Sequence, residues 1–232
     1  MISVCMATYN GERYIEKQLA SIIKNLSLED EIIVSDDGSS DHTLDIINSY
    51  KEEFPNIKII KGPQKSVQQN FDNTIRYACG DIIFLSDQDD IWMDNKVEIV
   101  SKCFQNSNIN VVLHDAVMID GNGNEMYPSF YAYRKSKKGF IANIIRNSYL
   151  GCCMAFRNTL KEKILPIPEC VEMHDTWIGL IGEWTHSSVF IDDKLICYRR
   201  HQNNVSSLHH YPLKKMIQKR LVFLNEIFKR MR

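Results

Sequence analysis

The segment from Ile82 to Asp90 constrains the fold of this chain more than any other stretch. Four apolar residues, Ile82–Leu85, are followed by a serine and then by the acidic sequence at 87–90. A short run that is apolar at every position predicts a strand buried on both faces, ending at the edge of a sheet. Because side chains alternate along extended chain, Asp87 and Asp89 are expected on the same side, about 7 Å apart along the backbone. Two like charges so placed repel, and a hard divalent cation carrying an anionic group such as a diphosphate would neutralise them.

Two other interpretations apply to the same acidic sequence. Asp90 or Asp94 could cap the helix that is expected to follow, since a carboxylate there accepts backbone hydrogen bonds. A calcium-binding EF-hand loop that began at Asp87 would place its last ligand at Glu98. That loop needs glycine at its sixth position, where this chain has Trp92, so the EF-hand interpretation fails.

Composition limits the remaining classes of protein. The 232 residues suit one sizeable domain, with or without a small appendage. The formal net charge of -1 removes a global electrostatic case for nucleic acid as a partner. Seven cysteines without a C-x-x-C pair favour reduced thiols and a cytoplasmic protein over a disulfide framework or a zinc ribbon. The chain starts without the basic region of a signal peptide, and no apolar run approaches the roughly 18 residues of a membrane span.

The first part of the chain alternates between strand and helix patterns. The predicted strands are Ile2–Ala7, Glu31–Ser35, Ile57–Ile60 and the run that starts at Ile82. The predicted helices, with apolar residues at helical spacing, cover about 15–26, 44–54 and 67–75. Strands that alternate with helices imply a parallel sheet with right-handed crossovers, so the carboxyl ends of these strands share one edge.

Polar residues stand at three of these strand ends. Thr8 and Tyr9 follow the first strand, Asp36 and Asp37 follow the second, and the acidic sequence at 87–90 follows the fourth. A parallel sheet brings them to a crevice at its carboxyl edge, where open α/β sheets bind their ligands. Three such clusters indicate a metal and nucleotide site. The chain has neither a G-x-G-x-x-G after its first strand nor a P-loop sequence, so neither of those motifs accounts for the crevice.

The second part of the chain lacks this regular alternation. The elements expected there are a helix over 96–104, strands at 111–113 and 116–119, a turn at 120–123, a mobile loop over 127–138, a short helix over 140–146, a strand at 152–156, a helix that opens at 172–177, and strands at 188–191 and 195–199.

Residues 208–232 form a C-terminal segment rich in lysine and arginine. Its apolar residues recur on one helical stripe, made of Leu213, Met216, Ile217, Leu221, Leu224 and Phe228. A basic amphipathic helix of this kind is typical of peripheral contact with an anionic leaflet, here the inner face of the cell membrane. A helix docked on its own domain or on a partner subunit shows the same pattern, and both interpretations stay open.

Taken in order, these polar motifs resemble those of family 2 glycosyltransferases of the GT-A fold, in particular the bacterial rhamnosyltransferase-like members. The matching sequences are Val4–Gly11, Ile33–Asp41, Ala78–Asp90, Gly151-Cys152, His174–Trp177 and Tyr198–Asn204. The resemblance implies an α/β fold with a Rossmann-like, mostly parallel sheet flanked by helices and a mixed acceptor-side half. It implies a glycosyltransferase domain over 1–207, with a nucleotide-binding half over about 1–105 and an acceptor half over about 106–207.

The resemblance also implies a donor site. Thr8, Tyr9 and one of Asp36 and Asp37 would hold the base and ribose of a nucleotide-sugar, and Asp87 would lie near the ribose. The chemistry agrees, because the imide proton of a pyrimidine base needs a carboxylate acceptor.

By the same resemblance, Asp89 would bind Mn²⁺ or Mg²⁺ bridging the diphosphate of the donor. His201 is either a further metal ligand or diphosphate contact, or a solvated surface histidine. Asp175 matches the position of the general base, which takes the proton of the acceptor hydroxyl as its oxygen attacks the anomeric carbon and inverts it. A helix N-cap is the structural alternative for Asp175 and is compatible with that role. His174 is expected to orient its neighbour or to shape the acceptor pocket.

The implied function is metal-dependent, inverting transfer of a sugar to a hydroxyl of a glycan or lipid-linked acceptor. A dTDP-linked rhamnose is favoured as donor, with UDP-sugars close behind. A haloacid-dehalogenase-like phosphatase also carries Asp-x-Asp after an apolar strand, but there the strand is the first of the fold and here it is the fourth. A catalytically silent nucleotide-sugar binder is a third class, and the candidate base at Asp175 counts against it.

Overall fold

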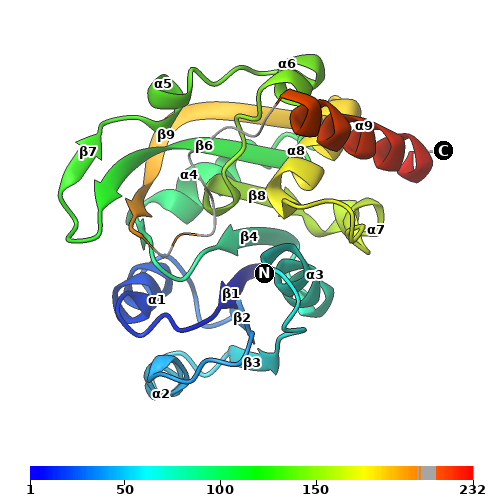
Figure 1. The fold of residues 1–232 in the computed structure, drawn as a ribbon. Helices are drawn as coiled ribbons and strands as arrows, with labels where there is room; N and C mark the ends of the chain where they lie inside the picture. Colours follow the sequence, from blue (N-terminus) through cyan, green and yellow to red (C-terminus); the bar gives the residue numbers. More distant parts are fainter. Residues whose placement is uncertain (203, 205–212, 232) are drawn as a thin grey trace.

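The computed structural model describes residues 1–202, 204 and 213–231 (Figure 1). Asn203, which belongs to the last matching motif, lies outside the described residues. The predicted domain boundary at 207 and the predicted start of the C-terminal segment at 208 lie outside them as well.

The order of elements begins as predicted, with strands and helices in alternation. The strands are β1 (Ile2–Thr8), β2 (Glu31–Asp36), β3 (Ile57–Lys61), β4 (Ile82–Ser86), β5 (Ile91–Trp92), β6 (Val111–Asp120), β7 (Glu125–Tyr127), β8 (Met154–Arg157) and β9 (Ser188–Arg200). The helices are α1 (Ile15–Ile23), α2 (Thr43–Ser49), α3 (Val67–Tyr77), α4 (Lys96–Cys103), α5 (Phe130–Arg134), α6 (Phe140–Ile145), α7 (Lys161–Ile164), α8 (His174–Trp184) and α9 (Leu213–Arg230). Two 3₁₀ turns, η1 (Gly151–Cys153) and η2 (Asn158–Leu160), flank β8.

All described strands belong to one sheet. Its first part has the order β3-β2-β1-β4, and these strands pair in parallel. Its second part is mixed, because β8 runs antiparallel to both β4 and β6, β9 runs parallel to β6, and β5 runs antiparallel to β9. The predicted sheet, parallel in the nucleotide half and mixed in the acceptor half, is confirmed.

Two layers of apolar side chains cover the faces of this sheet. In β1, Val4 and Met6 join one buried cluster together with Ile15 of α1. The intervening Cys5 points to the opposite cluster, where Phe71 of α3 lies. This is the alternation expected of a strand that is buried on both faces, and it places α1 and α3 on opposite sides of the sheet (Figure 1).

Two predictions for the acceptor half are wrong in detail. The chain over 188–200 is one continuous strand, β9, where two strands were expected. The short strand β5 was not predicted, and it pairs with β9 through Ile91 and Trp92. A strand of two residues carries no periodicity, so only its pairing partner reveals it.

The prediction of a loop over 127–138 is also wrong in part, since α5 lies within it. The Ser129 hydroxyl caps this helix by accepting a hydrogen bond from the backbone N–H of Ala132 (3.0 Å). Asp115 of β6 then holds the helix start, because its carboxylate accepts bonds from the Ser129 hydroxyl (2.5 Å) and the Tyr131 N–H (2.8 Å). The capping serine is a local signal, whereas the anchoring carboxylate comes from a distant strand.

Helix α9 packs on its own domain. Ile227 is fully buried, and Phe223 and Met231 pack partly buried against the same cluster. The Arg230 guanidinium donates hydrogen bonds to the carbonyl oxygens of Leu165 (2.9 Å) and Pro166 (2.7 Å). The docking interpretation of the C-terminal segment therefore holds for this face of the helix, which is not the stripe that the sequence pattern picks out.

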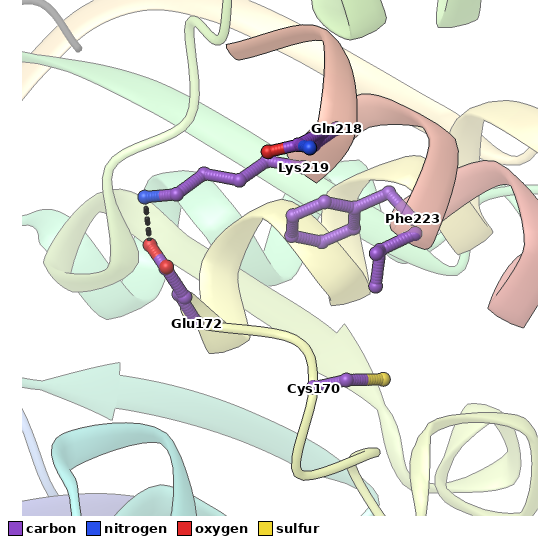
Figure 2. A pocket seen from close by; sticks show the side chains of 6 residues that line it. Cys170, Glu172, Gln218, Lys219 and Phe223 are labelled. Atoms are coloured by element: carbon purple, nitrogen blue, oxygen red, sulfur yellow. Dashed lines mark hydrogen bonds and ion pairs between the residues drawn. The ribbon is translucent and has the colours of Figure 1, made fainter. Parts of the chain in front are cut away.

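A groove of about 240 Å³ separates the start of α9 from the segment that leads into α8 (Figure 2). Cys170 and Glu172 line it on one side, and Gln218 and Phe223 line it on the other. An ion pair between Glu172 and Lys219 crosses it. The groove is thus closed at one side by a contact between α9 and the chain just before α8.

None of the helices in the described part of the chain combines the length and apolar character that crossing a bilayer requires.

Candidate active site

The carboxyl ends of β1 and β2 lie side by side, as parallel pairing requires. Thr8 and Asp36 are register partners, and the Thr8 hydroxyl donates a hydrogen bond to Asp36 Oδ2 (2.9 Å). The other oxygen of Asp36 accepts backbone bonds from Gly38 (3.0 Å) and Ser39 (2.8 Å). Asp36 is buried, and both of its oxygens accept hydrogen bonds from Thr8 and from the loop that follows the strand.

Asp37 is more open than its neighbour. Its Oδ1 accepts the backbone N–H of Gln64 (2.9 Å), and Oδ2 accepts no hydrogen bond within the described residues. Partial burial raises the pKa of Asp37, the Gln64 hydrogen bond opposes this, and the charge of Asp36 adds to the rise. A Cβ at Gly62 would lie 2.2 Å from Asp37 Oδ1, so the turn after β3 needs glycine there. Of the two predicted carboxylates, Asp37 is the one with an oxygen available to a ligand.

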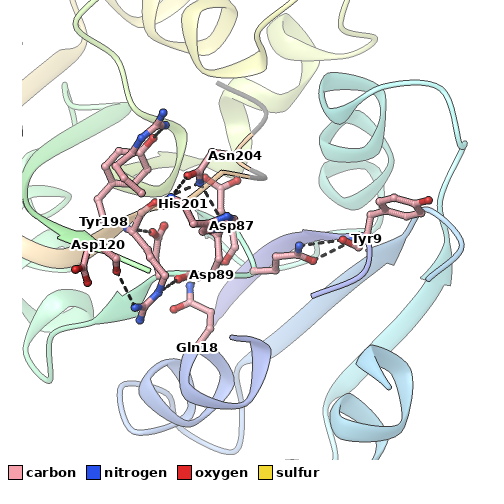
Figure 3. Close-up of polar contacts among 12 residues, drawn as sticks. Tyr9, Gln18, Asp87, Asp89, Asp120, Tyr198, His201 and Asn204 are labelled. Carbon is pink, nitrogen blue, oxygen red and sulfur yellow. Dashed lines mark hydrogen bonds and ion pairs between the residues drawn. The ribbon is translucent and has the colours of Figure 1, made fainter. Parts of the chain in front are cut away.

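Tyr9 lies apart from Asp87 and Asp89 (Figure 3). Its side chain is 57% exposed, and its backbone exchanges two hydrogen bonds with the Gln88 amide, at 2.9 and 3.0 Å. Gln88 therefore turns away from its acidic neighbours and ties the loop after β1 to the loop after β4. A Cβ on Gly11 would lie 2.5 Å from Gln88 Oε1, so the close packing of these loops depends on that glycine.

The acidic sequence is not an extension of β4. The strand ends at Ser86 and the chain bends at residues 88–89, so the alternation of an extended chain does not continue through the carboxylates. The possible ligand atoms of Asp87, Asp90 and Cys152 all lie within 4.8 Å of one another. The bend brings Asp87 close to Asp90. An extended chain would instead have placed Asp87 and Asp89 on the same side.

Burial and neighbouring charges act together on Asp87. Burial raises its pKa well above the usual value, and the charges of Asp90, Asp89 and Asp175 raise it further, while Lys96 lowers it. Asp175 lies in the first turn of α8, in the acceptor half. Carboxylates from both halves therefore raise the pKa of Asp87.

Asp89 meets the C-terminal end of β9. Its Oδ2 lies 2.7 Å from His201 Nε2 and 3.3 Å from the Asn204 amide nitrogen, which donates to it (Figure 3). The His201 side chain is only 14% exposed. The structure thus places His201 against Asp89, and the alternative of a solvated surface histidine is wrong.

Arg199 is the residue that fastens β9 to the acidic loop. Its backbone N–H donates to Asp90 Oδ1 (2.8 Å), and its guanidinium donates to the carbonyl oxygens of Asp89 (2.7 Å) and Asp120 (3.2 Å). The Tyr14 ring lies 4.8 Å from the Arg199 guanidinium and stacks on the His201 ring at a centroid distance of 4.9 Å. A residue from the start of the nucleotide half therefore helps to position the histidine of the acceptor half.

Asp90 and Lys96 are both fully buried beneath this loop. Burial and the charge of Asp89 raise the pKa of Asp90, and its Oδ2 has no hydrogen-bond partner among the described residues. The Lys96 ammonium donates to the Cys152 carbonyl oxygen (2.7 Å) and lies 4.1 Å from the Trp92 ring centroid. Burial lowers the pKa of Lys96 to about 8. Asp90 does not cap α4, whose N-cap is Asn95, so the capping interpretation of Asp90 is wrong.

Asp175 lies in the first turn of α8 and is buried. Met173 is the N-cap residue, so the interpretation of Asp175 as the cap is wrong. Its Oδ1 accepts the N–H (2.5 Å) and the hydroxyl (3.2 Å) of Thr176. Burial raises the pKa of Asp175, and the bonds from Thr176 and the backbone of Gly151 oppose the rise. A raised pKa strengthens a carboxylate as a base.

His174 supports its neighbour through packing. Its ring stacks on Phe71 of α3 at 3.8 Å, and a Cβ on Gly151 would lie 2.8 Å from its Nε2. Burial lowers the pKa of His174 to about 3, which leaves the ring neutral at ordinary pH. Both ring nitrogens are buried without a hydrogen-bond partner in the described part of the chain. The ring fills the space between α3 and η1, next to the backbone that carries Asp175.

Several residues of the site were missed by sequence reasoning, namely Tyr14, Asp90 as a buried group, Lys96, Arg199 and Asn204. Lys96 carries a signal, because a lysine four residues before Val100 stands on the apolar side of its helix. Arg199 and Asn204 lie inside a matching motif, so their positions were marked but not their roles. Nothing local marks Tyr14, whose partners come from the other end of the domain.

The donor set at the acidic loop suits a hard divalent cation. Carboxylate oxygens and an imidazole nitrogen are ligands that Mn²⁺ and Mg²⁺ accept, and they converge at the pair of Asp89 and His201. The buried Asp90 Oδ2 without a hydrogen-bond partner adds negative potential that a cation would offset. These residues therefore fit the metal that the resemblance implies.

The sheet order and the position of the acidic crevice define an α/β protein of the GT-A fold. Among solved structures, S. aureus TarS 1-349 in complex with UDP-GlcNAc superposes with a TM-score of 0.75 at 20% identity, covering 98% of this chain and 66% of that one. Mannosyltransferase PcManGT from Pyrobaculum calidifontis, in complex with GDP-Man and Mn²⁺, gives 0.65 at 18% identity, covering 87% and 57%.

The family model described as glycosyl transferase family 2 matches residues 3–165, and the chain belongs to that family. It is 30% identical to dTDP-rhamnosyl transferase RfbG of Shigella flexneri, covering 86% of this chain and 72% of that one. It is 26% identical to the UDP-Glc:alpha-D-GlcNAc-diphosphoundecaprenol beta-1,3-glucosyltransferase WfgD of Escherichia coli, covering 93% and 83%. An uncharacterized Nostoc glycosyltransferase, alr2836, is 28% identical over 72% of this chain, which spans only 53% of that relative.

Proposed function

We propose that this chain is an inverting, metal-dependent glycosyltransferase that moves a sugar from a nucleotide-sugar to a hydroxyl of a glycan or lipid-linked acceptor. One observation carries the proposal. The possible ligand atoms of Asp87 and Asp90 lie within 4.8 Å of that of Cys152, and a Cβ on the adjacent Gly151 would lie 3.7 Å from the Asp175 Cβ, so the acidic loop and Asp175 meet at one turn. A donor site and a base at one crevice are what transfer between two substrates requires.

The donor would lie across the carboxyl ends of β1, β2 and β4. Asp37 would accept the imide proton of the base through its available oxygen, next to Thr8 and Tyr9. Asp36 would hold the shape of this pocket through Gly38 and Ser39. Mn²⁺ or Mg²⁺ held by Asp89 and His201 would neutralise the negative charge that develops on the leaving diphosphate.

Asp175 would act as the general base. Burial raises the pKa of its carboxyl, so the carboxylate binds a proton more readily than an exposed aspartate does. The acceptor oxygen forms a bond to the anomeric carbon on the face opposite the diphosphate, and the proton of the hydroxyl moves to Asp175. The old bond from the anomeric carbon breaks at the same time, and its electron pair leaves with the diphosphate. Thr176 would hold the carboxylate in place through two hydrogen bonds.

Two donors are supported to different degrees. The similarity to dTDP-rhamnosyl transferase RfbG favours dTDP-rhamnose, and the similarity to the glucosyltransferase WfgD favours UDP-glucose as the second choice. Because WfgD is named for a diphosphoundecaprenol acceptor, a lipid-linked acceptor at the inner face of the membrane is part of the proposal. Thermal-shift measurements with each donor and Mn²⁺ separate the candidates, because a bound ligand stabilises the folded chain in proportion to occupancy.

Replacing one carboxylate in each half tests the proposal. Asp175→Asn keeps the shape of the side chain and removes the base, so kcat is expected to fall about 10²- to 10⁴-fold while donor binding stays near normal. Asp89→Ala is expected to abolish the metal dependence of donor binding together with transfer. Asp193→Asn, an exposed residue of β9, is the matched control and is expected to leave both unchanged. Wild-type turnover by Asp175→Asn would rule out the assigned base.

The same assays distinguish the two alternatives. Phosphate released from simple monoesters, without sugar transfer, would favour a phosphatase with Asp87 as its nucleophile. Metal-dependent donor binding without transfer to any hydroxyl acceptor would favour a silent binder. Neither alternative function assigns a role to the buried Asp175 carboxylate.

A further inference from the structure

Two helices of the acceptor half expose rows of apolar side chains. On α6, Ile141 and Ile145 are 74% and 61% exposed and stand one helical turn apart. On α9, Ile217, Leu221 and Phe228 are 47%, 60% and 49% exposed and fall on one face at the spacing of the helix. The fully buried residue of α9 is Ile227, which does not belong to this row. Several large apolar side chains exposed together mark a contact site.

The two rows belong to one surface. Trp184, at the end of α8, packs edge-on against Phe140 of α6 at 5.3 Å and against Phe228 of α9 at 5.1 Å. The Arg220 guanidinium of α9 also donates a hydrogen bond to the carbonyl oxygen of Ile145 at the end of α6. Figure 1 shows α6 and α9 beside each other on the side of the molecule away from β1–β3. None of these three contacts is visible in the sequence, where the helices are far apart.

The segments that contain α6 and α9 are basic in sequence although the whole chain is nearly neutral. No acidic residue occurs between Glu125 and Glu162, and five basic residues occur over 134–146. Helix α9 contains six basic residues and one acidic residue. Lys137 and Arg146, which flank α6, are exposed. The contact between α6 and α9 therefore brings two basic segments together, in which Lys219 and Lys229 pair with Glu172 and Glu226 while Lys137 and Arg146 stay exposed.

We propose that α6 and α9 form one docking surface for an anionic lipid bilayer. Its apolar rows would enter the boundary between headgroups and acyl chains, and the surrounding lysines and arginines would contact lipid phosphates. Both rows stand on outward faces of helices with basic side chains beside them, which matches an extended anionic plane. The proposal goes beyond the C-terminal helix, because it gives α6 an equal share of the contact.

The surface is also connected to the proposed base. Asn147 follows the end of α6 by two residues, and its amide donates a hydrogen bond to the Thr176 hydroxyl (2.8 Å). Thr176 in turn holds the Asp175 carboxylate. Docking at α6 would therefore set Asp175 close to the membrane plane, where the hydroxyl of a lipid-linked acceptor lies. This last step rests on the proposed function, whereas the docking surface itself does not.

Vesicle co-sedimentation of the full chain tests the surface without any sugar. Wild type is expected to bind phosphatidylcholine vesicles that contain about 30% phosphatidylglycerol and to bind pure phosphatidylcholine at least about tenfold more weakly. The double variant Ile141→Ser/Ile145→Ser and the single variant Leu221→Ser are each expected to weaken binding to the anionic vesicles about tenfold. Lys137→Glu/Arg146→Glu is expected to weaken it to a similar degree and to reduce its dependence on salt.

Leu28→Ser is the matched control, because Leu28 is 70% exposed and precedes β2 at the other end of the molecule. It is expected to bind as wild type does. All altered positions are exposed, and circular dichroism checks that each variant folds. Unchanged binding by the α6 double variant would overturn the two-helix surface. A dimer of the wild type in light scattering that the same variant converts to monomer would assign the surface to a second copy instead.

Transfer to a short, soluble acceptor separates this proposal from the proposed function. Wild-type transfer by the α6 variant, combined with lost vesicle binding, supports both. Vesicle binding by a wild-type chain that transfers no sugar keeps the docking surface and overturns the proposed function.

Discussion

The two halves of the domain build their parts of the site in different ways. In the nucleotide half, Asp36 is held by Thr8 from the adjacent strand and by residues two and three positions further on. The acceptor half contributes through long-range contacts, since its His201 holds Asp89 of the acidic loop, which is 112 residues away. Regular βα units place their polar groups by local rules, whereas the mixed part of the sheet places them through long-range pairing. The two halves should therefore respond differently to mutation.

Removing the long-range contacts of Arg199 should have the largest effect on stability. Arg199→Met deletes two hydrogen bonds to carbonyl oxygens and the contact with the Tyr14 ring. We expect the free energy of unfolding to fall by about 2–4 kcal/mol in urea denaturation, because the guanidinium is buried and its acceptors lose their partner. Arg76→Met in the nucleotide half removes an ion pair between a half-exposed guanidinium and the buried Asp72 carboxylate, and because solvent screens the guanidinium it is expected to cost only about 1 kcal/mol. Equal losses of unfolding free energy in the two variants would contradict the proposed difference between the halves.

A glycine in each half gives a smaller and more selective test. Gly151→Ala places a methyl group against His174, and we expect it to destabilise the chain by about 1–3 kcal/mol and to lower kcat, since Asp175 lies beside the same turn. Gly11→Ala places its methyl group against the flexible Gln88 side chain, so its main effect should be a higher KM for the donor. Steady-state kinetics and urea denaturation separate the two outcomes. If Gly151→Ala raised the KM for the donor without lowering kcat, the link between η1 and the proposed base Asp175 would be wrong.

Acid should affect the acceptor half first. Burial lowers the pKa of His174 to about 3, whereas an unfolded histidine titrates near 6.5. The unfolded chain therefore binds a proton that the folded chain does not, and stability is lost as pH falls from about 6.5 toward 3, by up to about 1.4 kcal/mol per pH unit. His174→Gln is expected to remove this contribution in denaturation curves measured between pH 7 and pH 4.

Glu31 supplies the comparison in the nucleotide half. Its burial raises its pKa, but hydrogen bonds from Lys58, Ser3 and Cys79 outweigh burial and leave the pKa below its usual value. Stability from Glu31 is thus present above the ordinary glutamate pKa and is lost only as pH falls below it.

His186→Asn, at an exposed position, is the control for His174→Gln and should leave the pH slope unchanged. An unaltered slope in His174→Gln would contradict the buried, neutral ring.

Prediction from sequence succeeded where the chain follows a local rule. The strands before Thr8, Asp36 and Asp87 were expected within one residue of their observed ends, because each apolar run stops abruptly at a polar residue. The alternation rule failed at the acidic sequence, since it holds only while the chain stays extended. It failed also for α9, where Ile217, Leu221 and Phe228 of the predicted stripe are exposed and Ile227, outside the stripe, is the buried residue. Both faces of that helix carry apolar residues, so spacing alone could not tell which one packs.

The sequence by itself determined the parallel half of the sheet, the edge at which its polar residues gather, and the family. It did so because hydrophobic period, strand ends and motif order are properties of neighbouring residues. Only the tertiary structure decided that β9 is one strand, that it pairs with β5, and that this pairing delivers Arg199 and His201 to the acidic loop. It alone showed Lys96 and Asp90 buried below the site and α6 lying against α9. Contacts between residues a hundred positions apart depend on how whole elements pack, and no local pattern records that packing.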